Sequence, residues 1–234
     1  MMTRILALFS ILLMLAGCAA GPEPMPPETS DQFRISNIAI AYSYPDKAIN
    51  YSEDVYKVLW IEKRGNGVSF EGLWDIDKDL SAFYNQKMTN LGLNTTSVFD
   101  TLTPAQKESF YLKMAVNHNK DGLIDSIKID EESRKALLQN NQDYLVIFYQ
   151  APLHLQVHDW FNNIFIQSAT RVEVIDLKDN SEAFSTFEYL FHVHKYVEQP
   201  REIESNNLAG FKAMLKDAIE KQFHEKRLAA QLNM

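Results

Sequence analysis

Three long segments decide the fold: DYLVIFYQAPLHLQV at residues 143–157, IFIQSATRVEVIDL at 164–177 and EAFSTFEYLFHVHKY at 182–196. All three are rich in the β-branched and aromatic residues that favour strands. The two segments between them are short and carry Asp, Asn or Ser, which are typical of turns. Strands joined by short turns pair antiparallel, so this region predicts a three-stranded antiparallel meander.

Further strands and helices are predicted on both sides of the meander. Apolar spacing and end signals predict a strand at 35–42, helices at 75–91, from Thr103-Pro104 and at 131–140, and a short strand at 95–99. Arg64-Gly65-Asn66-Gly67 predicts the tight turn of a hairpin between strands at 55–62 and 68–71. Residues 206–232 carry one apolar stripe, which predicts a long amphipathic helix on the sheet. We therefore expect an α+β fold, or an α/β sandwich, in which a mixed sheet ends in the meander and is covered by helices.

The first seventeen residues have the pattern of a secretory signal peptide. Arg4 precedes the apolar stretch ILALFSILLMLA at 5–16, and twelve helical residues reach only about 18 Å. A hydrocarbon core of about 30 Å is too thick for such a segment to cross. Residues 1–17 are therefore predicted to be a signal that is removed on export.

The signal ends in Leu15-Ala16-Gly17-Cys18, which resembles the lipobox of bacterial lipoproteins. The resemblance implies that the signal is cut before Cys18, and that Cys18 carries a diacylglyceryl group and an acylated amine. It also implies the periplasmic face of the outer membrane, because Ala19 stands where an aspartate would retain such a protein at the inner membrane. The alternative is a general secretory signal in which Cys18 is incidental.

Composition limits what the rest of the chain can be. Cys18 is the only cysteine in 234 residues, which excludes an internal disulfide and a Cys-rich metal site. The net charge of −8 argues against a nucleic-acid surface and leaves the covalent lipid as the expected membrane contact. Residues 18–32 contain four prolines and predict an extended tether, and 33–234 are expected to form a single periplasmic domain.

Two local patterns extend the resemblance to the domain itself. A segment ending in ALLQNNQ at 136–142 leads into the strand DYLVIF, and RVEVIDLKDN at 171–180 has the pattern of a hairpin. With the predicted order of elements, these patterns are similar to a group of bacterial envelope lipoproteins with a small α/β domain. The group includes the curli-secretion lipoprotein, the lipoprotein activators of penicillin-binding proteins and the auxiliary lipoproteins of envelope transporters. The resemblance covers about residues 33–230 and carries over no functional residue other than Cys18.

One loop resembles the first positions of an EF-hand calcium loop. Asn117, Asn119, Asp121 and Asp125 fall at the spacing of its oxygen ligands, which suits a cation that takes six to eight oxygens. Lys128 stands where the loop needs a bidentate glutamate. We favour a surface turn over a calcium site, and no other cofactor is expected.

Four histidines form a second candidate for metal binding. His154 and His158 share one face of their strand, and His192 and His194 share one face of theirs. Short turns would place His154, Gln167 and His192 in one row, which could bind zinc or copper. The interpretation that we favour puts the histidines on the outer face of a half-buried sheet. The opposite, apolar faces would then point inward, with Leu153, Leu155 and Val157 on one strand and Phe187, Tyr189, Phe191 and Val193 on the other.

No catalytic motif supports an enzyme. Asp75, Asp77 and Asp79 could bind magnesium or act as acid and base, but they precede or begin a predicted helix, where its positive end favours them. A nucleophile elbow, a Walker loop and a dinucleotide fingerprint are all missing from the sequence. A hydrolase with a site that the sequence does not reveal is the least favoured hypothesis.

The sequence therefore favours a non-enzymatic accessory lipoprotein that docks on a protein of a secretion, transport or cell-wall machine. Trp160 and Phe161 lie in an exposed-looking turn and are the predicted docking anchors. The alternative is a ligand-binding module for calcium or for a small apolar or glycan ligand. Self-association of the chain is compatible with either hypothesis.

Overall fold

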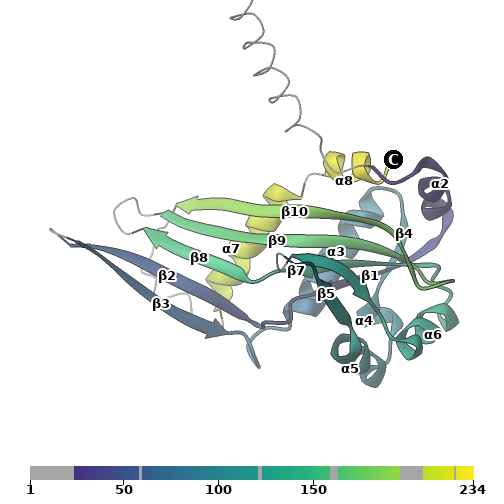
Figure 1. Cartoon of the computed structure of the whole chain (residues 1–234), viewed down its shortest axis with the longest axis horizontal. Helices are drawn as coiled ribbons and strands as arrows, with labels where there is room; N and C mark the ends of the chain where they lie inside the picture. The colour runs from purple at the N-terminus through teal and green to yellow at the C-terminus, as the bar shows by residue number, and fades with distance from the viewer. Residues whose placement is uncertain (1–23, 58–59, 121–122, 159–162, 196–207, 224) are drawn as a thin grey trace, which may run out of the picture.

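The computed structural model describes residues 24–57, 60–120, 123–158, 163–195, 208–223 and 225–234. Within these ranges an eight-stranded mixed sheet is covered by helices, and a separate two-stranded hairpin packs beside it (Figure 1). The mixed α/β fold that the sequence predicts is confirmed.

The long strand β9 (Asn163–Asp176) organises the sheet. One of its edges pairs antiparallel with β10 (Ser181–Lys195) along almost its whole length. The other edge pairs antiparallel first with β8 (Leu153–His158) and then with β7 (Tyr144–Gln150). β7 and β8 therefore lie end to end, and β9 holds both of them in one sheet.

The strands beyond β7 and β8 repeat this end-to-end arrangement. β1 (Asn37–Ser43) is parallel to β7 and also to β4 (Asn94–Ser97). β2 (Ala48–Lys57) is parallel to β8 and antiparallel to β3 (Trp60–Ser69). The sheet thus has a half built on β7 and β1 and a half built on β8 and β2.

The predicted turn at residues 64–67 is wrong. Arg64 to Gly67 lie inside β3 and pair with residues 50–53 of β2, and the pairing of the two strands continues to Lys57 and Trp60. Gly67 does not adopt a positive φ, the conformation for which a tight turn uses glycine. Residues 64–67 instead extend β3 along the part of β2 that also pairs with β8, so strand pairing prevails over the local turn pattern.

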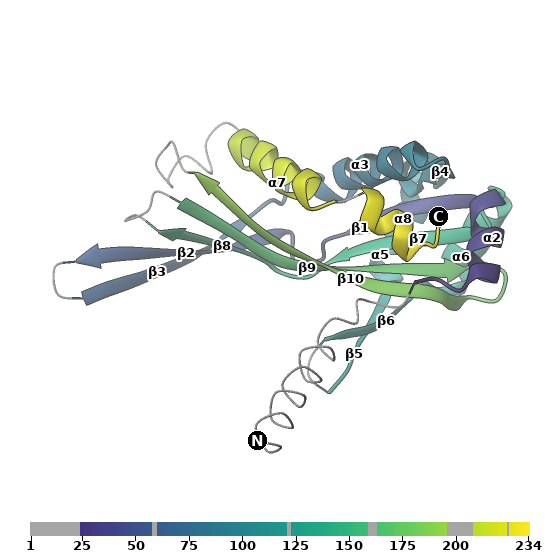
Figure 2. The same cartoon turned by 90° about the horizontal axis from the view of Figure 1, so that it is seen from above.

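Helices cover one face of the sheet over β1, β7, β9 and β10, and the β2–β3 hairpin projects beyond them (Figure 2). α3 (Ile76–Asn90) packs over β1, and α7 (Ala209–Gln222) and α8 (Glu225–Gln231) pack over β9 and β10. The single C-terminal helix predicted at 206–232 is therefore two helices, separated at Phe223. Ile38, Ile40 and Tyr42 of β1 face this layer and are fully buried.

The opposite face is covered only over the half that contains β7 and β1. There α4 (Val98–Thr101), α5 (Pro104–Lys113) and α6 (Glu131–Gln139) pack together with the hairpin of β5 (Ala115–His118) and β6 (Ile124–Lys128). Ala39 and Ala41 of β1 point into this second core. Alternation along β1 thus separates two apolar clusters on the two faces of the sheet.

The N-terminal boundary of the domain lies earlier than residue 33. Pro27–Ile35 form the helix α2, and Met25 and Phe33 are fully buried. The Met25 amide donates to the Gln231 carbonyl over 2.7 Å, and the Ser30 hydroxyl donates to the Leu232 carbonyl over 2.7 Å. The second half of the expected tether is therefore packed against the C-terminus of the chain, so an extended tether can reach only from Cys18 to about Met25.

Two neighbouring substitutions on α2 test whether this helix belongs to the folded domain. Phe33→Ala removes a fully buried ring that contacts Tyr144 edge to face, and should lower the free energy of unfolding by about 3–5 kcal/mol. Ile35→Ala changes a side chain that is 88% exposed and should shift it by less than about 0.5 kcal/mol. Urea denaturation measures both. Equal effects of the two variants would place α2 outside the cooperative unit.

Candidate functional site

The predicted calcium loop lies at the turn of the β5–β6 hairpin, between strands rather than between helices. The Asn117 amide donates to the Ser126 hydroxyl across the hairpin, and the Asn119 side-chain oxygen accepts from the Leu123 backbone amide. Asp125 is exposed on β6, and Asp121 lies outside the described residues. Of the proposed ligand oxygens, that of Asn119 thus accepts a hydrogen bond within the hairpin, and the Asn117 side chain is held across the hairpin through its NH2 group.

The three carboxylates at the start of α3 point to different partners. Asp75 caps the helix by accepting from the Lys78 amide over 3.2 Å. Asp77 is buried, accepts from the Tyr44 amide and forms an ion pair with Lys47. Asp79 accepts from the Trp74 indole over 2.9 Å. Nowhere in the described part of the chain do three His, Cys, Asp or Glu side chains come together as they would around a metal ion.

The predicted row of His154, Gln167 and His192 is wrong by one residue. His154 lies opposite Gln167, but Gln167 lies opposite Phe191 on β10, and His192 lies opposite Ile166. Position 192 therefore does not belong to the row of His154 and Gln167.

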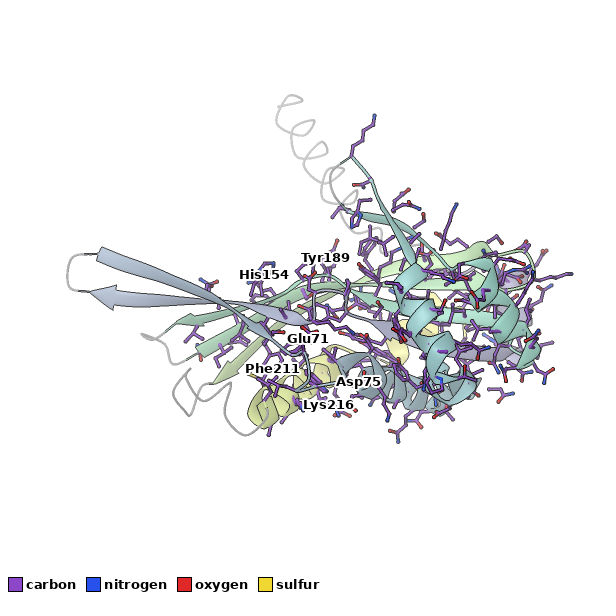
Figure 3. All side chains as sticks on the ribbon, turned by 90° about the horizontal axis from the view of Figure 1, so that it is seen from below. Glu71, Asp75, His154, Tyr189, Phe211 and Lys216 are labelled. Atoms are coloured by element: carbon purple, nitrogen blue, oxygen red, sulfur yellow. The ribbon has the colours of Figure 1, made fainter. Side chains whose placement is uncertain are left out.

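In the same register, the apolar side chains of β10 that were expected to point toward the helices lie on the opposite face of the sheet. Leu153, Leu155 and Val157 of β8 are buried under the helices, as predicted. Three of the four side chains expected to be buried on β10 are instead exposed: Tyr189 is 70%, Phe191 54% and Val193 42% exposed. The fourth, Phe187, is partly buried against the second core. Figure 3 places Tyr189 and His154 on the side of the sheet opposite to Phe211 and Lys216 of α7.

These exposed side chains belong to one continuous surface, which we call the open face. It consists of His154 on β8, Phe165 and Gln167 on β9, and Tyr189, Phe191 and Val193 on β10. The rings of Phe165 and Phe191 are 6.1 Å apart. Among the described elements, the β5–β6 hairpin and α4–α6 cover only the other half of this side of the sheet, and the side chains of the open face are exposed or partly exposed.

A buried ion pair holds the hairpin on the sheet next to the open face. Glu173 of β9 is 1% exposed, and its carboxylate accepts from the Ile127 amide and from Arg171 over 2.7 Å. Arg171 also donates to the Ile124 carbonyl and to Glu182, and lies over the Phe187 ring. Burial raises the pKa of the Glu173 carboxyl, and the Arg171 guanidinium opposes that increase.

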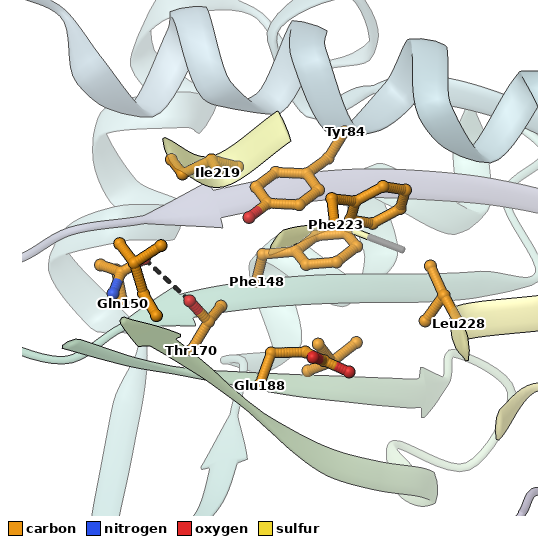
Figure 4. A pocket seen from close by; sticks show the side chains of 10 residues that line it. Tyr84, Phe148, Gln150, Thr170, Glu188, Ile219, Phe223 and Leu228 are labelled. Carbon is orange, nitrogen blue, oxygen red and sulfur yellow. Dashed lines mark hydrogen bonds between the residues drawn. The ribbon is translucent and has the colours of Figure 1, made fainter. Parts of the chain in front are cut away.

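On the helix-covered face, a small aromatic pocket lies under the break between α7 and α8 (Figure 4). Its cavity volume is about 30 Å³, and the side chains that line it come from β7, β9, β10, α3 and the two C-terminal helices. Gln150 forms its polar wall: the side-chain oxygen accepts from Thr170 over 2.8 Å and from the Tyr42 hydroxyl over 3.3 Å. The sequence showed no signal for this pocket, because its lining residues are far apart along the chain.

Removing the positive partner of the buried pair should destabilise the domain in a pH-dependent way. Arg171→Met leaves the Glu173 carboxylate buried without its cation and should lower the free energy of unfolding by about 3–5 kcal/mol at pH 8. The raised pKa of Glu173 means that the folded state takes up a proton more readily than the unfolded state. The loss should therefore shrink as the pH falls toward 5.

The matched control is Lys113→Met, which breaks a surface pair with Glu132. Because both partners are exposed to solvent, this change should leave the stability nearly unchanged at either pH. Urea denaturation at pH 8 and pH 5 gives both values, and a pH-independent loss in the Arg171 variant would contradict the prediction.

Cys18, Trp160 and Phe161 lie outside the described residues, so their predicted roles as lipidation site and docking anchors stay predictions. Among the described helices, none is both long and apolar enough to cross a membrane. No protein-family model matches the chain, and no curated protein matches it either.

Proposed function

We propose that the protein is a lipid-anchored component of the bacterial envelope that holds a partner protein on its open face. The observation that carries the proposal is the exposure of Tyr189, Phe191 and Val193 on β10. Three large apolar side chains at alternate positions of one strand form a contiguous patch, and such patches on soluble domains mark interaction sites. The proposed role needs no catalytic group.

The strand that carries the patch also has a backbone edge suited to a protein partner. β10 pairs with β9 along one edge, and no described strand pairs with its other edge. Residues 189–193 contain none of the Lys, Pro or Gly residues with which proteins usually block an exposed edge. A partner strand could add its main-chain hydrogen bonds here while its side chains pack against the patch.

The position of the patch relative to the anchor argues for a protein rather than the bilayer. Cys18 is seven residues from the buried Met25, a span of at most about 25 Å. α2 contacts the end of the sheet where β10 begins. Phe33 of α2 packs on Tyr144 of β7, and Tyr144 pairs with Asp176 of β9. Asp176 in turn pairs with Ser181, the first residue of β10. β10 then runs fifteen residues, or about 50 Å, away from that end (Figure 1). The patch therefore lies toward the end of the domain far from the proposed anchor.

Site-specific photo-crosslinking in intact cells tests the docking surface. A photoreactive residue at Tyr189 or Phe191 should give a crosslinked product of one defined mass, because the partner covers both positions. The same residue at Leu112, which is 81% exposed on α5, should give none. Crosslinks that are equally strong at Leu112, or absent from both β10 positions, would contradict the proposal. A product of twice the mass of the chain would identify a second copy as the partner.

Replacing the single cysteine tests the anchor separately. Cys18→Ser removes the only thiol that can carry a diacylglyceryl group, so labelled palmitate should not be incorporated. Ser10→Cys in a Cys18→Ser background is the control, because it restores a thiol at the wrong position and should not restore labelling. Labelling of Cys18→Ser would refute lipid anchoring at this residue.

A further inference from the structure

The exposed patch on β10 is symmetric about its central residue. Tyr189, Phe191 and Val193 stand at alternate positions of the strand, so Phe191 has one exposed apolar residue on each side. Alternate residues of a strand share a face of the sheet, and here that face is the open face. A second strand of the same sequence, running antiparallel to the first, would present the same pattern of apolar side chains to it.

The backbone of β10 is already held in the conformation that such a strand requires. β10 pairs antiparallel with β9 from Ser181 to Lys195, and no described strand pairs with its second edge. In Figure 1 β10 forms the border of the sheet next to β9. The N–H and C=O groups of an edge strand pair readily with a strand of another chain, so this border can extend the sheet across two molecules.

Charge decides which part of this border can pair with a copy of itself. The chain has a net charge of −8, so two copies repel each other unless acidic side chains lie away from the contact. Glu182 and Glu188 both belong to the first half of β10, and residues 189–195 contain neither Asp nor Glu. A pairing centred on Glu188 would place two carboxylates opposite each other, which is destabilising. The second half of the strand can pair with itself without this repulsion.

We propose, on the basis of the docking role proposed for the open face, that the partner is a second copy of this chain. The two β10 strands would pair antiparallel about a two-fold axis at Phe191. Tyr189 would then lie opposite Val193 of the second copy, and Phe191 opposite its own equivalent. Every exposed apolar residue of the patch thus meets another one, which is the self-complementarity that a two-fold interface needs.

A pairing centred one residue earlier matches the patch less well. It would set Val193 opposite Phe187 of the second copy, and Phe187 is already partly buried against the second core of its own chain. The register centred on Phe191 instead brings together two copies of the ring pair formed by Phe165 and Phe191, whose centroids are 6.1 Å apart. Aromatic pairs on neighbouring strands stabilise a sheet, so this register is the one that we test.

Disulfide trapping in intact cells tests both the contact and its register. With a mild oxidant, Phe191→Cys should give a disulfide-linked dimer, because residues that lie opposite each other have Cα atoms about 4.5–5.5 Å apart. Tyr189→Cys should not link to itself, because its equivalent is four residues away along the strand, or about 13 Å. Co-expression of Tyr189→Cys with a tagged Val193→Cys should restore the linked dimer.

The natural chain, which has Cys18 alone, supplies the background of this experiment. No linked dimer in Phe191→Cys above that background would overturn the proposal. A linked dimer in Tyr189→Cys as strong as that in Phe191→Cys would overturn the register.

Native mass spectrometry of the full-length protein, released from detergent micelles, measures the oligomeric state independently. The natural chain should be a dimer, and Phe191→Lys should raise its dissociation constant at least about tenfold, because the two lysines would face each other across the axis. Leu112→Lys adds the same charge on α5, at a side chain that is 81% exposed, and should leave the dimer unchanged. A monomeric natural chain, or an undiminished dimer in Phe191→Lys, would refute self-pairing.

These outcomes can be told apart from a failure of the docking role itself. Photo-crosslinks from Tyr189 and Phe191 to a protein of another mass, with no disulfide in Phe191→Cys, would refute the second copy and keep the docking role. The absence of photo-crosslinks from both positions would refute the docking role.

Discussion

The fold depends on β9, a strand of fourteen residues whose backbone is hydrogen-bonded to other strands along both of its edges. One edge is paired by the long β10, but the other is shared by β7 and β8, which are interrupted at Ala151-Pro152. Because β9 is continuous, it keeps the two shorter strands in line, and β1 and β2 follow them on the next row. The division of the sheet into two halves therefore follows from one unbroken strand.

That division decides where apolar surface remains exposed. The half built on β7 and β1 is covered on both faces and contains the buried alanines of β1 and the pair of Arg171 and Glu173. The half built on β8 and β2 receives helices on one face only. The aromatic pocket and the open face are thus separated by the thickness of the sheet, and β10 contributes Glu188 to one and Tyr189 to the other.

Local signals in the sequence predicted the elements whose ends are defined by neighbouring residues. The helix expected at 75–91 forms because Asp75 caps it and Gly92 follows it with a positive φ. The sequence could not predict the register of the β2–β3 hairpin, because Arg64 to Gly67 have the local pattern of a turn and yet pair with residues 50–53 inside the strands. It also could not predict the burial of β10: apolar residues occupy both faces of this strand, and only the distribution of helices decides which face is covered. The tether was predicted too long because prolines favour both an extended chain and the first turn of a helix such as α2.

The contact of α2 with the end of the chain has a mechanical consequence. Backbone hydrogen bonds from Met25 to Gln231, and from Ser30 to Leu232, connect the segment that follows the proposed anchor to the last helix. A load applied by a partner on β10 and resisted by a lipid at residue 18 would pass through this junction. The load would thus pass from the N-terminal segment directly to α8 through these hydrogen bonds. If the lipid anchor proposed at Cys18 is present, the stiffness of this junction would set how rigidly the open face is held relative to it.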